Sequence, residues 1–166
     1  MNTFKSLIKL LYMVLFDKEF NPEDFEKPYR PVTESITRMR YIGILMLYGI
    51  TPISINDPLD NTYERCSKED LDKIAQKLVM PADRYVLKSS DCEDYGLNGQ
   101  CRAAFDHGVS AVRLALGYIT TEYHGYLHAV DLDDNLWLLE PNAGFSHAGT
   151  WFKPGENGYQ TKKSLL

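Results

Sequence analysis

The stretch "SSDCEDYGLNGQCRAAFDHG" (residues 89–108) decides the fold, because it predicts a helix that packs closely against another element. A serine pair and an aspartate precede Cys92 and can cap the helix, so that Cys92 opens it. Gly96 and Gly99 each lower the stability of a helix by about 1 kcal/mol relative to alanine. Two glycines kept on one helix therefore indicate that something approaches its surface very closely.

The segments on both sides of this helix predict an α+β fold. Three strand-like runs follow it, and a tight Asp-Asp-Asn turn joins the last two into a hairpin. Two helices, capped by Thr33 and Ser67, and a proline-rich connector precede it. The predicted strands are 109–119, 123–132 and 136–140, the predicted helices are 34–49 and 68–80, and the connector is 21–32. We predict one domain, 1–166, made of an N-terminal helical part (1–80), a helix-plus-sheet core (85–145) and a loose C-terminal tail (146–166).

Composition narrows the class of protein. The chain carries 18 Lys and Arg against 23 Asp and Glu, a net charge of −5, and no run of basic residues. A protein that reads a nucleic-acid backbone needs a basic stripe, so this class is excluded. The three cysteines cannot all pair, and their spacing matches no zinc signature, which indicates free thiols in a reducing setting. We therefore predict a cytoplasmic location.

The N-terminal segment "TFKSLIKLLYMVLF" (3–16) is rich in apolar residues. Its uninterrupted apolar run, 10–16, is shorter than the 20 or so residues that span a bilayer, and no small-residue cleavage site follows it. The apolar residues recur at helical spacing. Three interpretations stay open: a helix docked on the core, which the pattern favours, a helix that inserts into a protein partner, and contact with a membrane.

Cys92 is a candidate nucleophile because of its place at the start of a helix. The positive end of the helix dipole lowers the pKa of a thiol there. Three neighbouring acids, Asp91, Glu93 and Asp94, act in the opposite direction unless they face away. Helix position alone therefore favours a structural cysteine over a catalytic one.

A reactive thiol also needs a base, and the sequence offers four histidines. His107 ends the same helix as Cys92, about 20 Å from its start, and is excluded. His147 lies in a glycine-rich tail. His124 and His128 fall on one face of the same predicted strand, and His128, in the middle of the strand, is the stronger candidate.

The hairpin brings a third polar group toward His128. With a turn near 133–135, His128 faces the neighbourhood of Glu140 and Asn142, either of which can orient an imidazole through its second nitrogen. A metal site formed by Cys92, His128 and a carboxylate is a minor alternative. The acidic stretch "DLDDN" (131–135) predicts a turn, because a calcium loop would need a glycine and a distal glutamate that are missing.

These motifs together, "DCEDYG", "HAV" and "LLEPN", resemble the papain-like and transglutaminase-like cysteine protease superfamily, in its compact bacterial and bacteriophage forms. The resemblance covers about residues 85–145. It implies a papain-like core, with a helix packed on a small antiparallel sheet. It also implies that Cys92 is the nucleophile, His128 the base and Glu140 the orienting group, with Asn142 as the alternative.

The resemblance implies a thiol hydrolase. Such an enzyme transfers an acyl group from an amide bond to water or to an amine, as a peptidase, an amidase or a transglutaminase does, and it uses no cofactor and no metal. Its partner would be a protein or peptide substrate. The alternative is a non-catalytic binding or structural module of the same fold, for example a bacteriophage component, that engages a protein partner through residues 3–16. The bacterial and bacteriophage forms imply a location in the cytoplasm of a bacterial host or in a virion.

Overall fold

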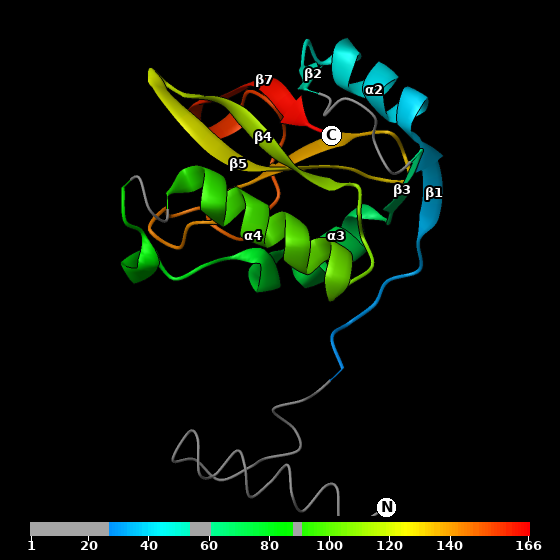
Figure 1. The fold of residues 1–166 in the computed structure, drawn as a ribbon, viewed down its shortest axis with the longest axis horizontal. Helices are drawn as coiled ribbons and strands as arrows, with labels where there is room; N and C mark the ends of the chain where they lie inside the picture. Colours follow the sequence, from blue (N-terminus) through cyan, green and yellow to red (C-terminus); the bar gives the residue numbers. More distant parts are fainter. Residues whose placement is uncertain (1–26, 54–60, 88–90) are drawn as a thin grey trace, which may run out of the picture.

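A five-stranded mixed sheet forms the centre of the protein in a computed structural model that describes residues 27–53, 61–87 and 91–166 (Figure 1). The predicted helix at 3–16 lies outside these residues. In chain order the elements are β1 (Glu34–Thr37), α2 (Arg38–Leu47), β2 (Thr51–Ile53), β3 (Thr62–Arg65), α3 (Lys68–Ala75), α4 (Cys92–Phe105), β4 (Val112–Ile119), β5 (Glu122–Val130), β6 (Leu136–Leu139) and β7 (Tyr159–Leu165). The strands β1 and β3 form a separate two-stranded sheet.

The order of the strands corrects the predicted papain-like core. The large sheet has the order β2-β7-β4-β5-β6, in which β2 and β7 run parallel and the other pairs antiparallel. Strand β7 comes from the segment predicted to be a loose tail. It pairs with β4 from Ala115 to Ile119. Its two exposed lysines, Lys162 and Lys163, concealed it in the sequence, because they interrupt the apolar alternation of a half-buried strand.

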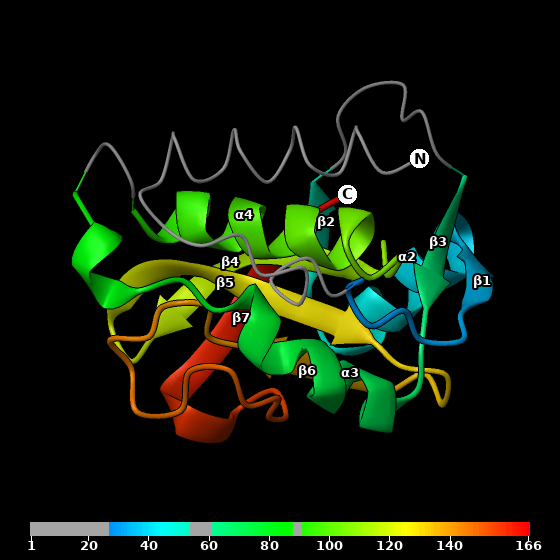
Figure 2. The same ribbon diagram turned by 90° about the horizontal axis from the view of Figure 1, so that it is seen from below.

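Helix α4 lies along one face of the sheet, as Figure 2 shows. A Cβ atom added to Gly96 would meet Leu114 of β4, and one added to Gly99 would lie 2.6 Å from Leu127 of β5. The prediction that these glycines mark a close approach is confirmed. Helix α3 packs beside α4 on the same face and shares its core, which is formed by Leu71, Ile74, Leu78, Ala103, Val112, Leu127, Ala129 and Leu139.

The opposite face is covered by α2 and by the segment that follows β6. Tyr41, Ile44 and Leu45 of α2 are buried with Val130 and Leu136, whereas Phe152 and Tyr159 are buried with Tyr126 and Leu138. The predicted helix at 34–49 is only partly right: its first four residues form β1, and Thr37, rather than Thr33, caps α2 by accepting from the Arg40 amide. The Ser67 cap of α3 is confirmed, since its hydroxyl accepts from the Asp70 amide at 3.1 Å.

The acidic stretch 131–135 forms the predicted turn between β5 and β6. The Asp131 carboxylate accepts from the amides of Asp133 and Asn135 at 2.9 Å each and from Trp137 Nε1 at 2.8 Å. The Asp131 oxygens therefore accept hydrogen bonds from groups of the turn itself and of the strand that follows it. Within the described part of the chain, no helix has the length and apolar character that crossing a membrane requires.

Candidate functional site

Cys92 opens α4, as its sequence context predicts, but its surroundings do not activate the thiol. The Asp91 and Asp94 carboxylates form a capping box around the first turn. The thiol donates to Glu93 Oε2 at 3.0 Å. Burial, reinforced by Glu93, raises the pKa of the Cys92 thiol to about 11, against a smaller lowering by a hydrogen bond from the Gly125 backbone. The thiol is therefore protonated at neutral pH.

His128 is buried in the sheet and makes its hydrogen bonds to groups other than the predicted ones. Its Nε2 lies 2.6 Å from Ser164 Oγ and its Nδ1 lies 3.3 Å from the Tyr41 hydroxyl. It is fully inaccessible to solvent, and across the hairpin it pairs with Leu138. Burial, and secondarily the Arg113 charge, lowers its pKa to about 3, so the imidazole is neutral.

Cys92 and His128 are also separated by the sheet. The first turn of α4 rests on Gly125, where an added Cβ would lie 3.2 Å from the Cys92 carbonyl. His128 is three residues further along β5, so its side chain points to the opposite face. The structure therefore does not bring the predicted nucleophile and base together.

Glu140 does orient a histidine, but this histidine is His124. Glu140 is fully buried, and its Oε2 accepts from His124 Nε2 at 2.8 Å and from the Tyr159 hydroxyl at 2.6 Å. Its Oε1 accepts from the Asn142 amide at 2.9 Å. Asn142, the alternative orienting residue, instead uses its side-chain oxygen to accept from the Gly144 amide. His124 lies nearer the end of the strand than His128, and this position is why the sequence favours His128 as the base.

The hydrogen bonds of Glu140 continue into an aromatic cluster. His147 Nε2 lies 3.1 Å from the Tyr159 hydroxyl, and the Tyr159 ring packs edge-on against Tyr126 with centroids 4.8 Å apart. Burial raises the pKa of Tyr159, and the Glu140 carboxylate adds to this, so the phenol stays protonated and donates to Glu140. Three donors thus satisfy the buried carboxylate and hold the His124 ring in one orientation.

The described residues offer a single group of metal-ligand type, formed by Asp91, Cys92 and Glu93, whose ligand atoms lie within 4.8 Å of one another. His128 does not belong to this group. The minor alternative of a metal held by Cys92, His128 and a carboxylate is therefore not assembled.

A tyrosine surface lies where the sheet extends past the start of α4. Tyr118 and Tyr123 are paired on β4 and β5, their rings are 5.4 Å apart edge to face, and they are 38% and 50% exposed. Both lie on the face that carries Gly125, because residues two apart on a strand share a face. Gln160 of β7 pairs with Tyr118, shares this face and is exposed. We call Tyr118, Tyr123 and Gln160 the tyrosine surface.

The comparisons with known proteins give similarity at the level of the fold. No family model and no curated protein matches the sequence. Among solved structures, the chain is similar to PSL1a in its complex with E64, with a TM-score of 0.58, 16% identity and coverage of 80% of this chain and 51% of that one. It is also similar to the Polyporus squamosus lectin bound to the human-type influenza-binding epitope Neu5Aca2-6Galb1-4GlcNAc, with a TM-score of 0.56, 15% identity and coverage of 80% and 49%. The chain spans about half the length of these structures.

These findings correct the interpretation drawn from the motifs. The solved structures that share the fold include a lectin, and no family model supports a papain-like or transglutaminase-like cysteine protease. The predicted thiol hydrolase acting on protein or peptide substrates, and the bacteriophage assignment that came with it, are corrected accordingly. The geometry agrees, because the Cys92 thiol is protonated and His128 is turned away from it.

Proposed function

We propose that this chain is a carbohydrate-binding domain and that the tyrosine surface is where it contacts the sugar. The observation that carries the proposal is the exposed Tyr118–Tyr123 pair on the part of the sheet that α4 leaves uncovered. Tyrosine offers a large and rigid contact area with a polar end, at a low cost in conformational entropy.

The surroundings of the pair supply the polar contacts that a sugar needs. The amide of Gln160 lies beside Tyr118 on the same face and can both donate to and accept from hydroxyl groups. Small-molecule sites commonly combine aromatic surface with a few such polar groups. The similarity of the fold to a lectin bound to a sialylated epitope supports a glycan as the class of ligand.

Titration calorimetry of the full chain tests this proposal. We expect binding of Neu5Aca2-6Galb1-4GlcNAc or of its uncharged part, Galb1-4GlcNAc. Tyr123→Ala should weaken it at least tenfold, which corresponds to about 1.4 kcal/mol. Tyr48→Ala is the matched control, since Tyr48 is 43% exposed but lies at the end of α2 on the opposite face.

Two results would overturn the proposal. One is full retention of glycan affinity in both Tyr118→Ala and Tyr123→Ala. The other is the absence of glycan binding to the wild-type chain across a panel of sialylated and neutral glycans. E64, the ligand of the other similar structure, is titrated in parallel, and binding of E64 without any glycan binding would contradict a carbohydrate-binding role.

A further inference from the structure

The outer face of α4 carries a row of apolar side chains that no described residue covers. Leu97, Cys101 and Phe105 follow one another at intervals of four residues, so they lie on one side of the helix. Leu97 is 38% and Phe105 77% exposed, and Cys101 is an exposed free thiol. The opposite side of α4 is already buried against the sheet. A helix that is apolar on both sides indicates a second partner.

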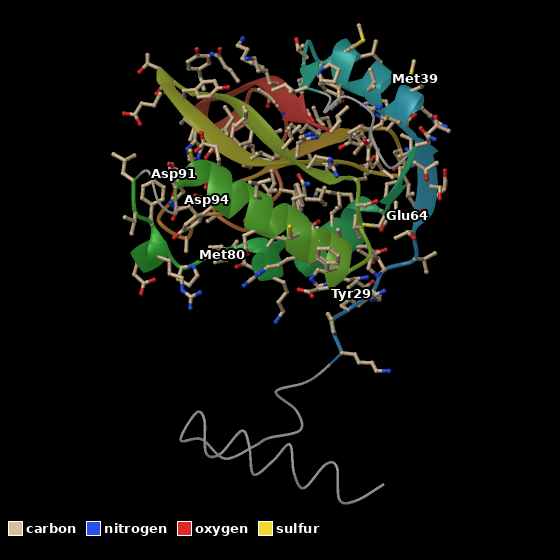
Figure 3. The ribbon with its side chains drawn as sticks, viewed as in Figure 1. Tyr29, Met39, Glu64, Met80, Asp91 and Asp94 are labelled. Atoms are coloured by element: carbon tan, nitrogen blue, oxygen red, sulfur yellow. The ribbon has the colours of Figure 1, made fainter. Side chains whose placement is uncertain are left out.

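The chain that leads to the N-terminal segment is held at the Phe105 end of this row. Arg30 donates from Nη2 to the Phe105 carbonyl at 2.8 Å, and the Tyr29 carbonyl lies 2.6 Å from His107 Nδ1. Figure 3 shows Tyr29 beside the C-terminal end of α4 and Asp94 near its opposite end. The residues before Lys27 therefore start from one end of the exposed row.

Length and chemistry make residues 3–16 the matching occupant. The ten residues 17–26 can span up to roughly 35 Å, whereas the 14 residues of α4 are about 21 Å long, so residues 17–26 are long enough to bring the segment 3–16 to any point of the row. The segment 3–16 also has 14 residues, with apolar side chains at helical spacing. It carries two lysines and no acid, whereas Asp94 and Asp106 flank the two ends of α4.

We propose that residues 3–16 pack along α4 over Leu97, Cys101 and Phe105, within the same chain. The contact would bury the apolar row and complete a second layer on the outer side of the helix. It also shields the Cys101 thiol, which gives a direct measurement.

Alkylation of Cys101 in the full chain, followed by peptide mass spectrometry, tests the contact. Leu11→Asp places a charge on the apolar face of the segment, and Ser6→Asp places the same charge outside its apolar row. We expect iodoacetamide to label Cys101 at least ten times faster in Leu11→Asp than in wild type, and Ser6→Asp to match wild type. Cys66, which is fully buried, must stay unlabelled in all three, which shows that the domain remains folded. Equal Cys101 rates in all three proteins would overturn the proposal.

Disulfide trapping distinguishes this arrangement from contact between two copies. Single cysteines introduced from 4 to 15 in the full chain should cross-link to Cys101 with a period near 3.6 residues, since a disulfide needs Cβ atoms about 4 Å apart. The cross-linked product should be monomeric at every protein concentration. Trapping without periodicity, or trapping that yields covalent dimers and grows with concentration, would contradict packing within one chain.

Discussion

Replacing Gly117 by alanine should destabilise the protein strongly. Gly117 lies in β4 at the point where the register with β7 shifts. An added Cβ would collide with the Gln160 carbonyl, and it would lie 2.7 Å from the Tyr126 hydroxyl and 2.9 Å from the Thr161 Cα. Two of these three atoms belong to the backbone of β7, so they cannot rotate away.

The size of the effect follows from these contacts. Overpacking of a core site costs about 1–3 kcal/mol. The Tyr126 hydroxyl also donates to Thr161 Oγ1 at 2.8 Å, and displacing it puts a further hydrogen bond worth about 1 kcal/mol at risk. We therefore expect a loss of about 2–4 kcal/mol in the free energy of unfolding.

Urea unfolding, followed by tryptophan fluorescence, measures this loss. With a slope of about 2 kcal/mol per molar urea, the midpoint should fall by about 1–2 M. Gly43→Ala is the matched control, because Gly43 lies in α2 with no atom within 4 Å of an added Cβ. That change should stabilise by up to about 1 kcal/mol. A Gly117→Ala midpoint equal to or above that of wild type would refute the close approach of β4 and β7.

Three further predictions follow from the site. In the unfolded chain His128 takes up a proton below about pH 6.5, whereas in the folded chain it stays neutral down to about pH 3. The free energy of unfolding therefore falls as the pH drops from 6.5 to 3. Between pH 6.5 and 3, His128→Gln should reduce the slope of the free energy of unfolding against pH by up to about 1.4 kcal/mol per pH unit. Urea midpoints at several pH values measure this slope, and equal slopes for wild type and variant would contradict the prediction. Cys92 has a pKa of about 11, so it should react with iodoacetamide at pH 7.5 at least tenfold more slowly than a free thiol. The reaction should be faster in Glu93→Gln, and rapid labelling of the wild type would contradict the raised pKa. Asp131→Ala should lower the free energy of unfolding by about 2–4 kcal/mol, because two backbone amides, the Asn135 side-chain amide and the Trp137 indole lose their acceptor. An unchanged thermal midpoint would count against this role for the carboxylate.

Local signals in the sequence predicted much of the second half of the fold. Gly96 and Gly99 indicated the approach of α4 to the sheet, and the Asp-Asp-Asn turn indicated the β5–β6 hairpin. These features depend on residues close together in the chain. Strand β7 could not be predicted in the same way, because its polar residues become a strand only through pairing with β4, about 45 residues earlier.

The choice of histidine shows why the candidate site was harder to predict than the fold. His124 and His128 share one face of β5, so periodicity could not separate them. What separates them is depth: His128 lies under α2 beside Tyr41, whereas His124 lies where the pairing with β6 has ended and Glu140 becomes accessible to it.

Gly125 is the sequence signal that distinguishes the two positions. The first turn of α4 needs a residue without a side chain beneath it, and an added Cβ at 125 would lie 3.1 Å from the Glu93 amide. His128 is followed by Ala129, which packs in the core with Leu127 rather than beneath the start of α4. A glycine after His124 therefore identifies the part of β5 on which Cys92 rests, although the His124 side chain, like that of His128, points to the opposite face of the sheet. The size of the side chain at the following position thus separates two histidines that periodicity places on the same face.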